Sequence, residues 1–164
     1  MGKRVRFDRD ARQSLWRGID ALASAVRITL GPRGRSVVLD RAAGHGPAIT
    51  RDGIAVASEI ELPDPFENMG VHMLREAALR TGLEAGDGTS TTTVLAHRLI
   101  GEGFGAIDAG GNPVAIRRGV EASVAAALGE LSRLARPLTE IGRAHVLNSS
   151  HTVISYAVFC LKKK

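Results

Sequence analysis

The sequence predicts a mainly α-helical fold, a helical bundle that carries one small β-hairpin element. Three observations support this prediction. Apolar residues recur at spacings of three and four along most of the chain before Pro137, which is the period of an amphipathic helix. Asp-Pro and Asn-Pro pairs mark two helix starts. Runs of β-branched residues are confined to two short segments.

Composition places the chain among ordinary globular proteins. Its 164 residues suffice for about one domain, and 44% hydrophobic with 24% charged residues is close to the globular average. A single cysteine excludes a disulfide scaffold. The sequence has no apolar run long enough to span a bilayer, and the charged first twelve residues do not form a secretory signal. We therefore expect a cytoplasmic protein without membrane contact.

The first helix is predicted over residues 7–30, with Asp8 as its N-cap. Its apolar stripe consists of Leu15, Ile19, Leu22, Val26 and Leu30. Gly31-Pro32 is predicted to end it. The β-branched run 36–40 is predicted to pair with 48–50 as a hairpin.

A short helix is predicted from about residue 52 to 60. Asp64-Pro65 then opens a helix whose apolar side chains are Met69, Met73, Leu74, Ala77 and Ala78. This helix is predicted to fade by Gly82. A further helix over 89–107 follows, and Asn112-Pro113 starts another, which runs through Ile116, Val120, Val124, Ala127, Leu131 and Leu134.

The net charge of +5 is unevenly distributed. The last 24 residues contain Arg143 and Lys162–Lys164 and no acidic residue, so residues 1–140 carry a net charge of +1. With only 4% aromatic residues, the chain also lacks stacking platforms for single-stranded nucleic acid. A basic nucleic-acid-binding module therefore ranks below the other hypotheses, and we expect no nucleic-acid partner.

The segment 86–93, Gly-Asp-Gly-Thr-Ser-Thr-Thr-Thr, has the parts of a phosphate cradle at a predicted helix N-terminus. Glycines let the backbone approach closely, and the helix dipole and the hydroxyls of Thr89, Ser90 and Thr91 favour an anion. Asp87 could hold Mg²⁺, which takes one or two carboxylates together with substrate phosphates. The same residues also suit an ordinary turn and a capped helix, so both interpretations stay open.

Two other loops give weaker local signals. In segment 29–35, a Gly-Pro helix stop precedes two arginines. In segment 50–53, Arg51 could bring a cation to a phosphate, and Asp52 could bring a carboxylate to a metal or water. A plain turn remains the alternative for each loop.

A series of short motifs occurs in a fixed order along the chain. They are Asp10-Ala11-Arg12, Arg17-Gly18, Thr29–Arg35, Val37–Asp40, Thr50–Gly53, Glu59–Leu62, Phe66–Gly70, Gly86–Thr89, Asn112-Pro113 and Arg118-Gly119. Together they resemble the N-terminus of group I (GroEL-type) chaperonins. The resemblance covers about residues 2–138, and motifs in order are far more specific than any single one.

The resemblance implies that residues 1–136 are the first segment of an equatorial ATP-binding domain and that 137–140 begin an intermediate domain. It implies an ATPase that assists protein folding as a homo-oligomeric double ring, with a GroES-type co-chaperonin and unfolded client proteins as partners. The apical domain and a second carboxylate that acts on the attacking water would lie outside this chain. We therefore expect the chain itself to be inactive in ATP turnover.

The resemblance also implies site residues. The cofactors would be ATP and Mg²⁺, with K⁺ as an additional candidate, and Asp87 would hold the metal. Asp52 would be the catalytic carboxylate near the γ-phosphate. The nucleotide-binding residues would be Thr29, Leu30, Gly31, Pro32, Arg51, Asp87, Gly88, Thr89, Ser90 and Thr91. Two positions depart from the usual pattern, because Arg51 stands where Lys is usual and Ser90 where Thr is usual.

Residues 141–164 resemble no chaperonin segment and are predicted to be a non-native tail. They look like the conceptual translation of a sequencing adapter, and the alternatives are an amphipathic strand with a basic anchor or a lineage-specific tail. For the chain as a whole, the alternative to a chaperonin segment is a non-catalytic helical oligomerisation domain.

Overall fold

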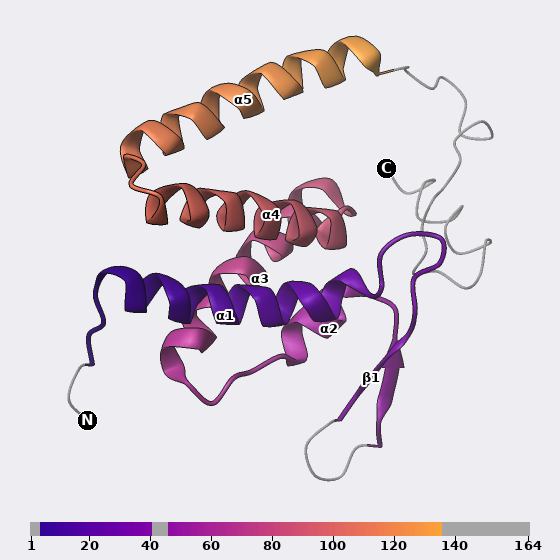
Figure 1. Ribbon diagram of the computed structural model, residues 1–164. Coiled ribbons are helices and arrows are strands. Elements are labelled where there is room, and N and C mark those ends of the chain that lie inside the picture. Colours follow the sequence, from indigo (N-terminus) through magenta and orange to yellow (C-terminus); the bar gives the residue numbers. More distant parts are fainter. Residues whose placement is uncertain (1–3, 41–45, 136–164) are drawn as a thin grey trace. The chain divides into compact units, whose positions relative to one another are not determined.

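The computed structural model describes residues 4–40 and 46–135 (Figure 1). The chain divides into two compact units, Met1–Phe104 and Gly105–Lys164. The elements of the first unit are α1 (Asp8–Arg27), β1 (Val37–Leu39), β2 (Ala48–Thr50), α2 (Gly53–Glu59), α3 (Pro65–Ala85) and most of α4 (Thr89–Asp108). The second unit contains the end of α4 and α5 (Pro113–Leu134). The described chain is mainly helical with one hairpin, as predicted, and none of its helices combines the length and apolarity needed to cross a membrane.

Helix α1 is shorter than predicted at its C-terminus. It ends at Arg27, and the Thr29 hydroxyl donates to the Val26 carbonyl (2.8 Å), closing the last turn. Leu30 therefore lies outside the helix, 40% exposed. The N-cap prediction was also wrong: Phe7 occupies that position without a side-chain hydrogen bond, and the Asp8 backbone has a positive φ of 50°, which aspartate tolerates better than most residues.

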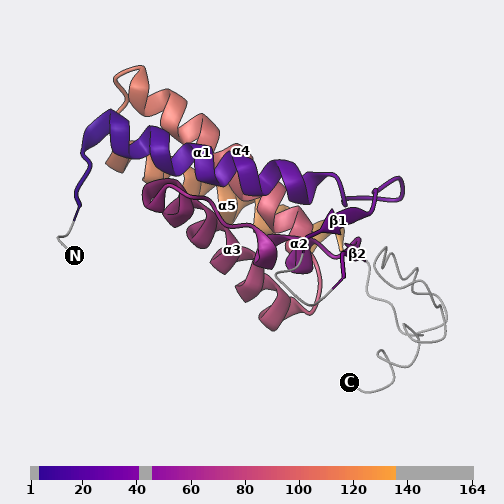
Figure 2. The ribbon, with the colours of Figure 1, turned by 90° about the horizontal axis from the view of Figure 1, so that it is seen from below.

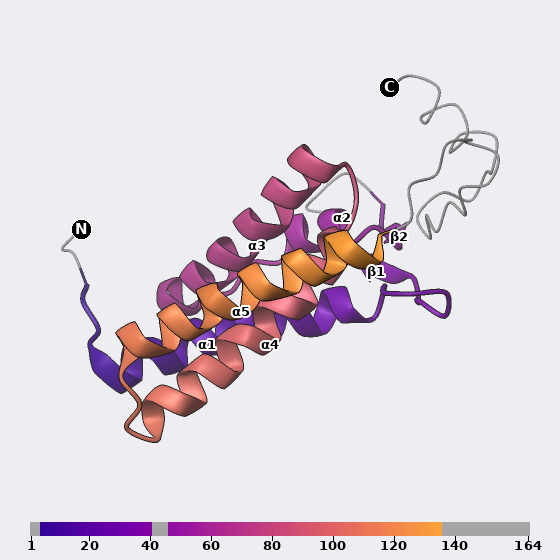
Figure 3. The same cartoon turned by 90° about the horizontal axis from the view of Figure 1, so that it is seen from above.

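The predicted hairpin is confirmed as an antiparallel pair of strands. Val38 lies opposite Ile49 and Leu39 opposite Ala48. Leu39 is buried, whereas Val38 and Ile49 are exposed. Figure 3 shows the strands beside α2, at the end of α1 farther from the N-terminus. Residues 41–45 of the connecting loop lie outside the described part of the chain.

The principal helix–helix interface joins α1 and α3, which lie side by side in Figure 2. At its centre, glycines on each helix face the backbone of the other. A Cβ atom on Gly18 would lie 1.8 Å from the Glu67 carbonyl oxygen, and one on Gly70 would lie 2.1 Å from the Leu15 carbonyl oxygen. The two helices therefore pack at backbone contact, closer than any larger residue permits.

Around this crossing, the buried core is built from three helices. Its members are Ile19, Leu22, Ala23 and Val26 from α1, Val56 and Ala57 from α2, and Val71 and Leu74 from α3. Ile19, Leu22 and Val26 belong to the predicted stripe, whereas Ala23 was not predicted and Leu30 is exposed. On α3 the prediction was partly wrong, because Met69 and Met73 are 51% and 61% exposed. The face of α3 that packs inward is centred on Gly70, Val71 and Leu74, one step around the helix from the methionines.

The short helix α2 is fixed at both of its ends. At its N-terminus, Asp52 accepts a hydrogen bond from the Ile54 N–H (3.1 Å). At its C-terminus, the Arg75 guanidinium of α3 donates to the carbonyl oxygens of Ala57 (2.7 Å) and Ile60. These bonds satisfy carbonyls that the helix end leaves without internal partners, and they place a positive charge at the negative end of its dipole.

Helix α3 continues through Gly82, where it was predicted to fade, and ends at Ala85, with Gly86 (φ 76°) as its C-cap. Gly82 is closely packed, because a Cβ atom there would lie 2.9 Å from Ile54 Cδ1 and 3.3 Å from Thr89 Cγ2. The small residue lets α2 and α4 approach α3 at this point.

Helix α4 contacts α1 through His97. The His97 ring stacks on Trp16 at a centroid distance of 4.7 Å. Its Nε2 lies 2.8 Å from an Asp20 oxygen, and its Nδ1 lies 3.2 Å from an Arg27 guanidinium nitrogen. Because arginine only donates, Nδ1 accepts this bond and the proton of the neutral ring lies on Nε2, facing Asp20. His97 is thus a packing residue.

Helix α5 begins as predicted at Asn112-Pro113, with the Asn112 side chain accepting from the Val114 and Ala115 N–H groups. None of its residues is buried. Its large exposed apolar residues are Val114, Val124, Leu128, Leu131 and Leu134.

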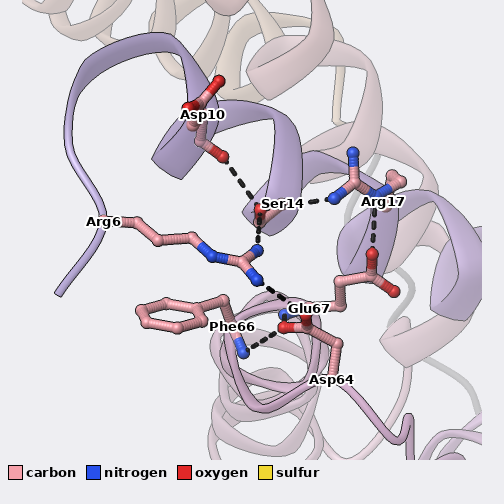
Figure 4. A network of polar contacts seen from close by, with 7 residues as sticks. All are labelled: Arg6, Asp10, Ser14, Arg17, Asp64, Phe66 and Glu67. Carbon is pink, nitrogen blue, oxygen red and sulfur yellow. Dashed lines mark hydrogen bonds and ion pairs between the residues drawn. The ribbon is translucent and has the colours of Figure 1, made fainter. Parts of the chain in front are cut away.

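A polar network ties the N-terminal segment to α1 and α3 (Figure 4). The Arg6 guanidinium donates to the Ser14 hydroxyl (2.5 Å) and to Asp64 (2.8 Å), and lies 4.3 Å from the centroid of the Phe66 ring. Ser14 is 1% exposed and donates in turn to the Asp10 carbonyl (2.8 Å). The network therefore anchors a segment that precedes the first helix.

Asp64 gives this network a pH dependence. Partial burial raises the pKa of Asp64, but hydrogen bonds from Phe66 N–H, Arg6 and Glu67 N–H outweigh it, so the pKa lies below its ordinary value of 3.8. A carboxyl whose pKa is lower in the folded state stabilises the fold above its unfolded pKa, and this contribution is lost as the pH falls through the folded value.

We expect Asp64→Asn to lower the melting temperature at pH 7 and to have a shrinking effect below about pH 4. Asparagine is as good an N-cap as aspartate, so the substitution removes mainly the charge. Melting temperatures of both proteins between pH 2.5 and 7 test this, with Glu61→Gln, at an exposed carboxylate, as the control. Parallel curves for Asp64→Asn and the parent chain would contradict the assignment.

Candidate functional site

Three predicted loops begin or end at one point of the first unit. Gly53 starts α2, Ser90 lies in the first turn of α4, and Val26 is in the last turn of α1. A Cβ atom on Gly53 would lie 2.1 Å from Ser90 Oγ and 3.2 Å from Val26 Cγ1. The segments 29–32, 51–53 and 87–91, which are far apart in sequence, therefore start from neighbouring positions.

The loop between α3 and α4 is shaped by two glycines. Gly86 and Gly88 both have positive φ angles, 76° and 85°, so the chain turns sharply on each side of Asp87. The first backbone bond of α4 runs from the Thr92 N–H to the Gly88 carbonyl (2.8 Å). The N–H groups of Thr89–Thr91 precede this bond and carry the positive end of the helix dipole.

Some hydroxyls at the start of α4 are used in internal hydrogen bonds, and others are open to a ligand. Thr93 is buried and donates to the Thr89 carbonyl (2.9 Å), and Thr92 bonds to Thr81 on α3 (3.0 Å). These two hydroxyls hold the start of α4 in place. Thr91 is exposed, and Ser90 is half-buried against Gly53. The hydroxyls available to a ligand are thus those nearest the loop.

Both candidate carboxylates take part in local backbone bonds. Asp87 accepts from the Gly88 N–H (2.7 Å), and Asp52 caps α2. In each case a single oxygen, Oδ1, accepts the bond. A carboxylate has further acceptor capacity, so these roles fit a second one as ligand to a metal or water. Among the described residues, no cluster of three or more His, Cys, Asp or Glu side chains is placed to hold a metal ion. A Mg²⁺ ion here would depend on one carboxylate plus phosphate oxygens, which is a usual arrangement for Mg²⁺.

The loop after α1 forms a hydrogen-bonded turn. Gly31 has a φ of 81°, and the Gly34 N–H donates to its carbonyl (2.9 Å). A Cβ atom on Gly34 would lie 2.2 Å from the Thr29 carbonyl oxygen, so this turn requires glycine. Thr29 is 2% exposed, and its hydroxyl is used within α1. Leu30 and Pro32 are exposed, so a ligand would meet these side chains and the backbone rather than the Thr29 hydroxyl.

Arg51 is the candidate residue whose side chain bonds to the segment before β1. Its Nε donates to Ser36 Oγ at 3.3 Å, which holds the guanidinium at the base of the hairpin. The side chain is exposed. The site residues that sequence reasoning did not single out are Gly53 and Gly82, which set how closely α2 and α4 approach. A glycine directly after a capping aspartate, at the start of a helix, was the available signal at Gly53.

The sequence matches the TCP-1/cpn60 chaperonin family over residues 22–159. Among curated proteins, it is similar to "Chaperonin GroEL 1" of Corynebacterium efficiens, with 44% identity over 161 residues. This alignment covers 96% of the chain and 30% of the relative, so the chain spans less than a third of that protein's length. The family match runs beyond residue 138 and includes part of the predicted non-native tail. The tail itself, like segment 137–140, lies outside the described residues.

Proposed function

Because this chain belongs to the TCP-1/cpn60 chaperonin family, we propose that its first unit forms the phosphate and metal side of an ATP site in an equatorial domain. The convergence of three loops around the Gly53–Ser90 contact is the observation that carries this proposal. In the complete protein, ATP hydrolysis would drive the folding of client proteins in a cytoplasmic double ring closed by a GroES-type co-chaperonin.

Each candidate residue has a role consistent with its surroundings. Asp87 would hold Mg²⁺, which supplies positive charge to the phosphate oxygens when bound. The N–H groups and hydroxyls of Thr89–Thr91 would bind phosphate oxygens at the start of α4. Arg51 would add positive charge from the hairpin side, and Asp52 would stand near the terminal phosphate. The exposed backbone and side chains of 30–32 would contact the rest of the nucleotide.

We expect MgATP to raise the melting temperature of the purified chain, because a ligand that binds the folded state stabilises it by mass action. ATP with EDTA should give a smaller rise. Phosphate release measured with malachite green should stay near background, since we propose that a second carboxylate outside this chain acts on the attacking water. Absence of any MgATP effect would contradict the ATP site, and turnover like that of a complete chaperonin would contradict the expected inactivity.

A helical oligomerisation domain remains the second candidate. The exposed apolar residues of α5, such as Leu128 and Leu131, favour it. Size-exclusion chromatography with light scattering distinguishes the two candidates. Concentration-dependent association without any response to MgATP would favour the second.

A further inference from the structure

Gly53 is buried at the centre of the candidate site, and it has no side chain to offer a ligand. We infer that the Gly53–Ser90 contact is a spacer that fixes the distance between Asp52 and the hydroxyls of α4, so that Gly53 is a positioning residue for MgATP. This inference rests on the proposed function. Its basis is that a Cβ atom on Gly53 would lie 2.1 Å from Ser90 Oγ and 3.2 Å from Ser90 Cβ. The contact leaves no room for one methyl group.

Helix α2 cannot move away to relieve such a clash. Its C-terminal carbonyls are held by Arg75, and Val56 and Ala57 are 0% and 1% exposed within the core. On the third side, Val26 Cγ1 lies 3.2 Å from the same Cβ position. A methyl group at residue 53 must therefore rotate the Ser90 hydroxyl away or displace the first turn of α4, and either change moves a group proposed to meet the phosphates.

The first turn of α4 is held against α3 by a second close contact. Gly82 faces the Thr89 methyl group and the Ile54 side chain, and the Thr81 and Thr92 hydroxyls are bonded at 3.0 Å. The start of α4 is therefore placed by α2 on one side and by α3 on the other. Asp52 directly precedes Gly53, and Thr89 and Thr91 flank Ser90. A displacement at the Gly53–Ser90 contact therefore changes the spacing between Asp52 and the hydroxyls of α4 that are proposed to meet the phosphates. Phosphate ligands that must act together are sensitive to shifts of about 1 Å.

The test is a double-mutant cycle on the full chain, with MgATP affinity measured by calorimetry and folding measured by circular dichroism and thermal melting. Gly53→Ala is expected to weaken MgATP binding about tenfold in the parent chain and about threefold or less in the Ser90→Ala background. Removing Ser90 Oγ relieves the 2.1 Å contact, and the remaining Cβ at 3.2 Å needs a shift of only a few tenths of an ångström. The control is Gly103→Ala in α4, the helix that contains Ser90. Nothing lies within 4 Å of the Gly103 Cβ position, so this variant should leave the MgATP affinity unchanged.

An equal effect of Gly53→Ala in both backgrounds, or parental affinity in Gly53→Ala, would overturn the inference while leaving the ATP site intact. Lack of MgATP binding by the parent chain would overturn the proposed function, and the inference with it. If Gly53→Ala does not fold, Gly82→Ala replaces it, because its Cβ would press on the flexible end of Ile54 (2.9 Å) and on Thr89 (3.3 Å). A folded Gly82→Ala should bind MgATP at least about threefold more weakly. Parental affinity would overturn the inference.

Discussion

Gly70→Ala is expected to lower the free energy of unfolding by about 3 kcal/mol, a large effect for a single added methyl group. The new Cβ would lie 2.1 Å from the Leu15 carbonyl oxygen and 3.2 Å from the Ile19 amide nitrogen. Both atoms belong to the backbone of α1, so no side-chain rotation relieves the overlap. The helices must separate, and the core residues on both sides of the crossing lose contact. Urea-induced unfolding followed by circular dichroism measures the change.

Gly18→Ala should have a similar effect, because its Cβ would lie 1.8 Å from the Glu67 carbonyl oxygen. The double variant should lose less than the two single losses combined, since one separation of the helices relieves both overlaps. Gly119→Ala is the matched control: it lies inside α5 with nothing within 4 Å of its Cβ position, and it should gain up to about 1 kcal/mol. A Gly70→Ala protein as stable as the parent chain would show that the helices do not pack at backbone contact.

Asp87→Asn is expected to remove the magnesium-dependent part of ATP binding. At a MgATP concentration of 100 times the dissociation constant, the parent chain should gain about 2.7 kcal/mol of stability, and the variant should lose most of that gain. An asparagine side-chain oxygen can still accept from the Gly88 N–H, so the loop keeps its conformation and only the metal ligand is lost. Melting temperatures with ATP, with and without Mg²⁺, measure the difference.

Glu84→Ala is the matched control for this experiment, because it removes an exposed carboxylate from the last turn of α3 near the same loop. It should respond to MgATP as the parent chain does. An Asp87→Asn protein that keeps the full magnesium-dependent shift would exclude Asp87 as the metal ligand.

Much of this fold could be predicted because the local signals agree with the tertiary structure. Asp64 and Asn112 cap their helices through side-chain oxygens, and the apolar stripe of α1 is the face that packs. The prediction was only partly right on the inward face of α3, where Leu74 and Ala78 are buried but Met69 and Met73 are exposed, because a periodicity argument counts apolar side chains. The closest contact on that face is made by Gly70, which has none. Close packing through glycine is a property of two helices together and leaves little trace in either segment alone.

In the candidate site, too, local features could be predicted from the sequence and tertiary contacts could not. The glycines of segment 86–93 predicted a turn before a helix, and the positive φ angles at Gly86 and Gly88 show that turn; its binding of an anion stays a prediction. Sequence could not show that Ser90 rests on Gly53, because that contact depends on where α2 lies, and α2 is placed by Arg75 and the core. Likewise, the partner of Arg51 depends on the hairpin, which brings Ser36 beside it.

The interlocked crossing of α1 and α3 also affects how this chain leaves the ribosome. Arg17 and Glu67, which pair beside the crossing at 2.6 Å, are 50 residues apart in sequence. At about 5–20 residues per second, several seconds separate the synthesis of the two helices. During that interval Leu22 and Val26, both 0% exposed in the folded protein, have no α3 to cover them. The apolar face of the nascent α1 therefore stays exposed to solvent until α3 has been synthesised and can pack against it.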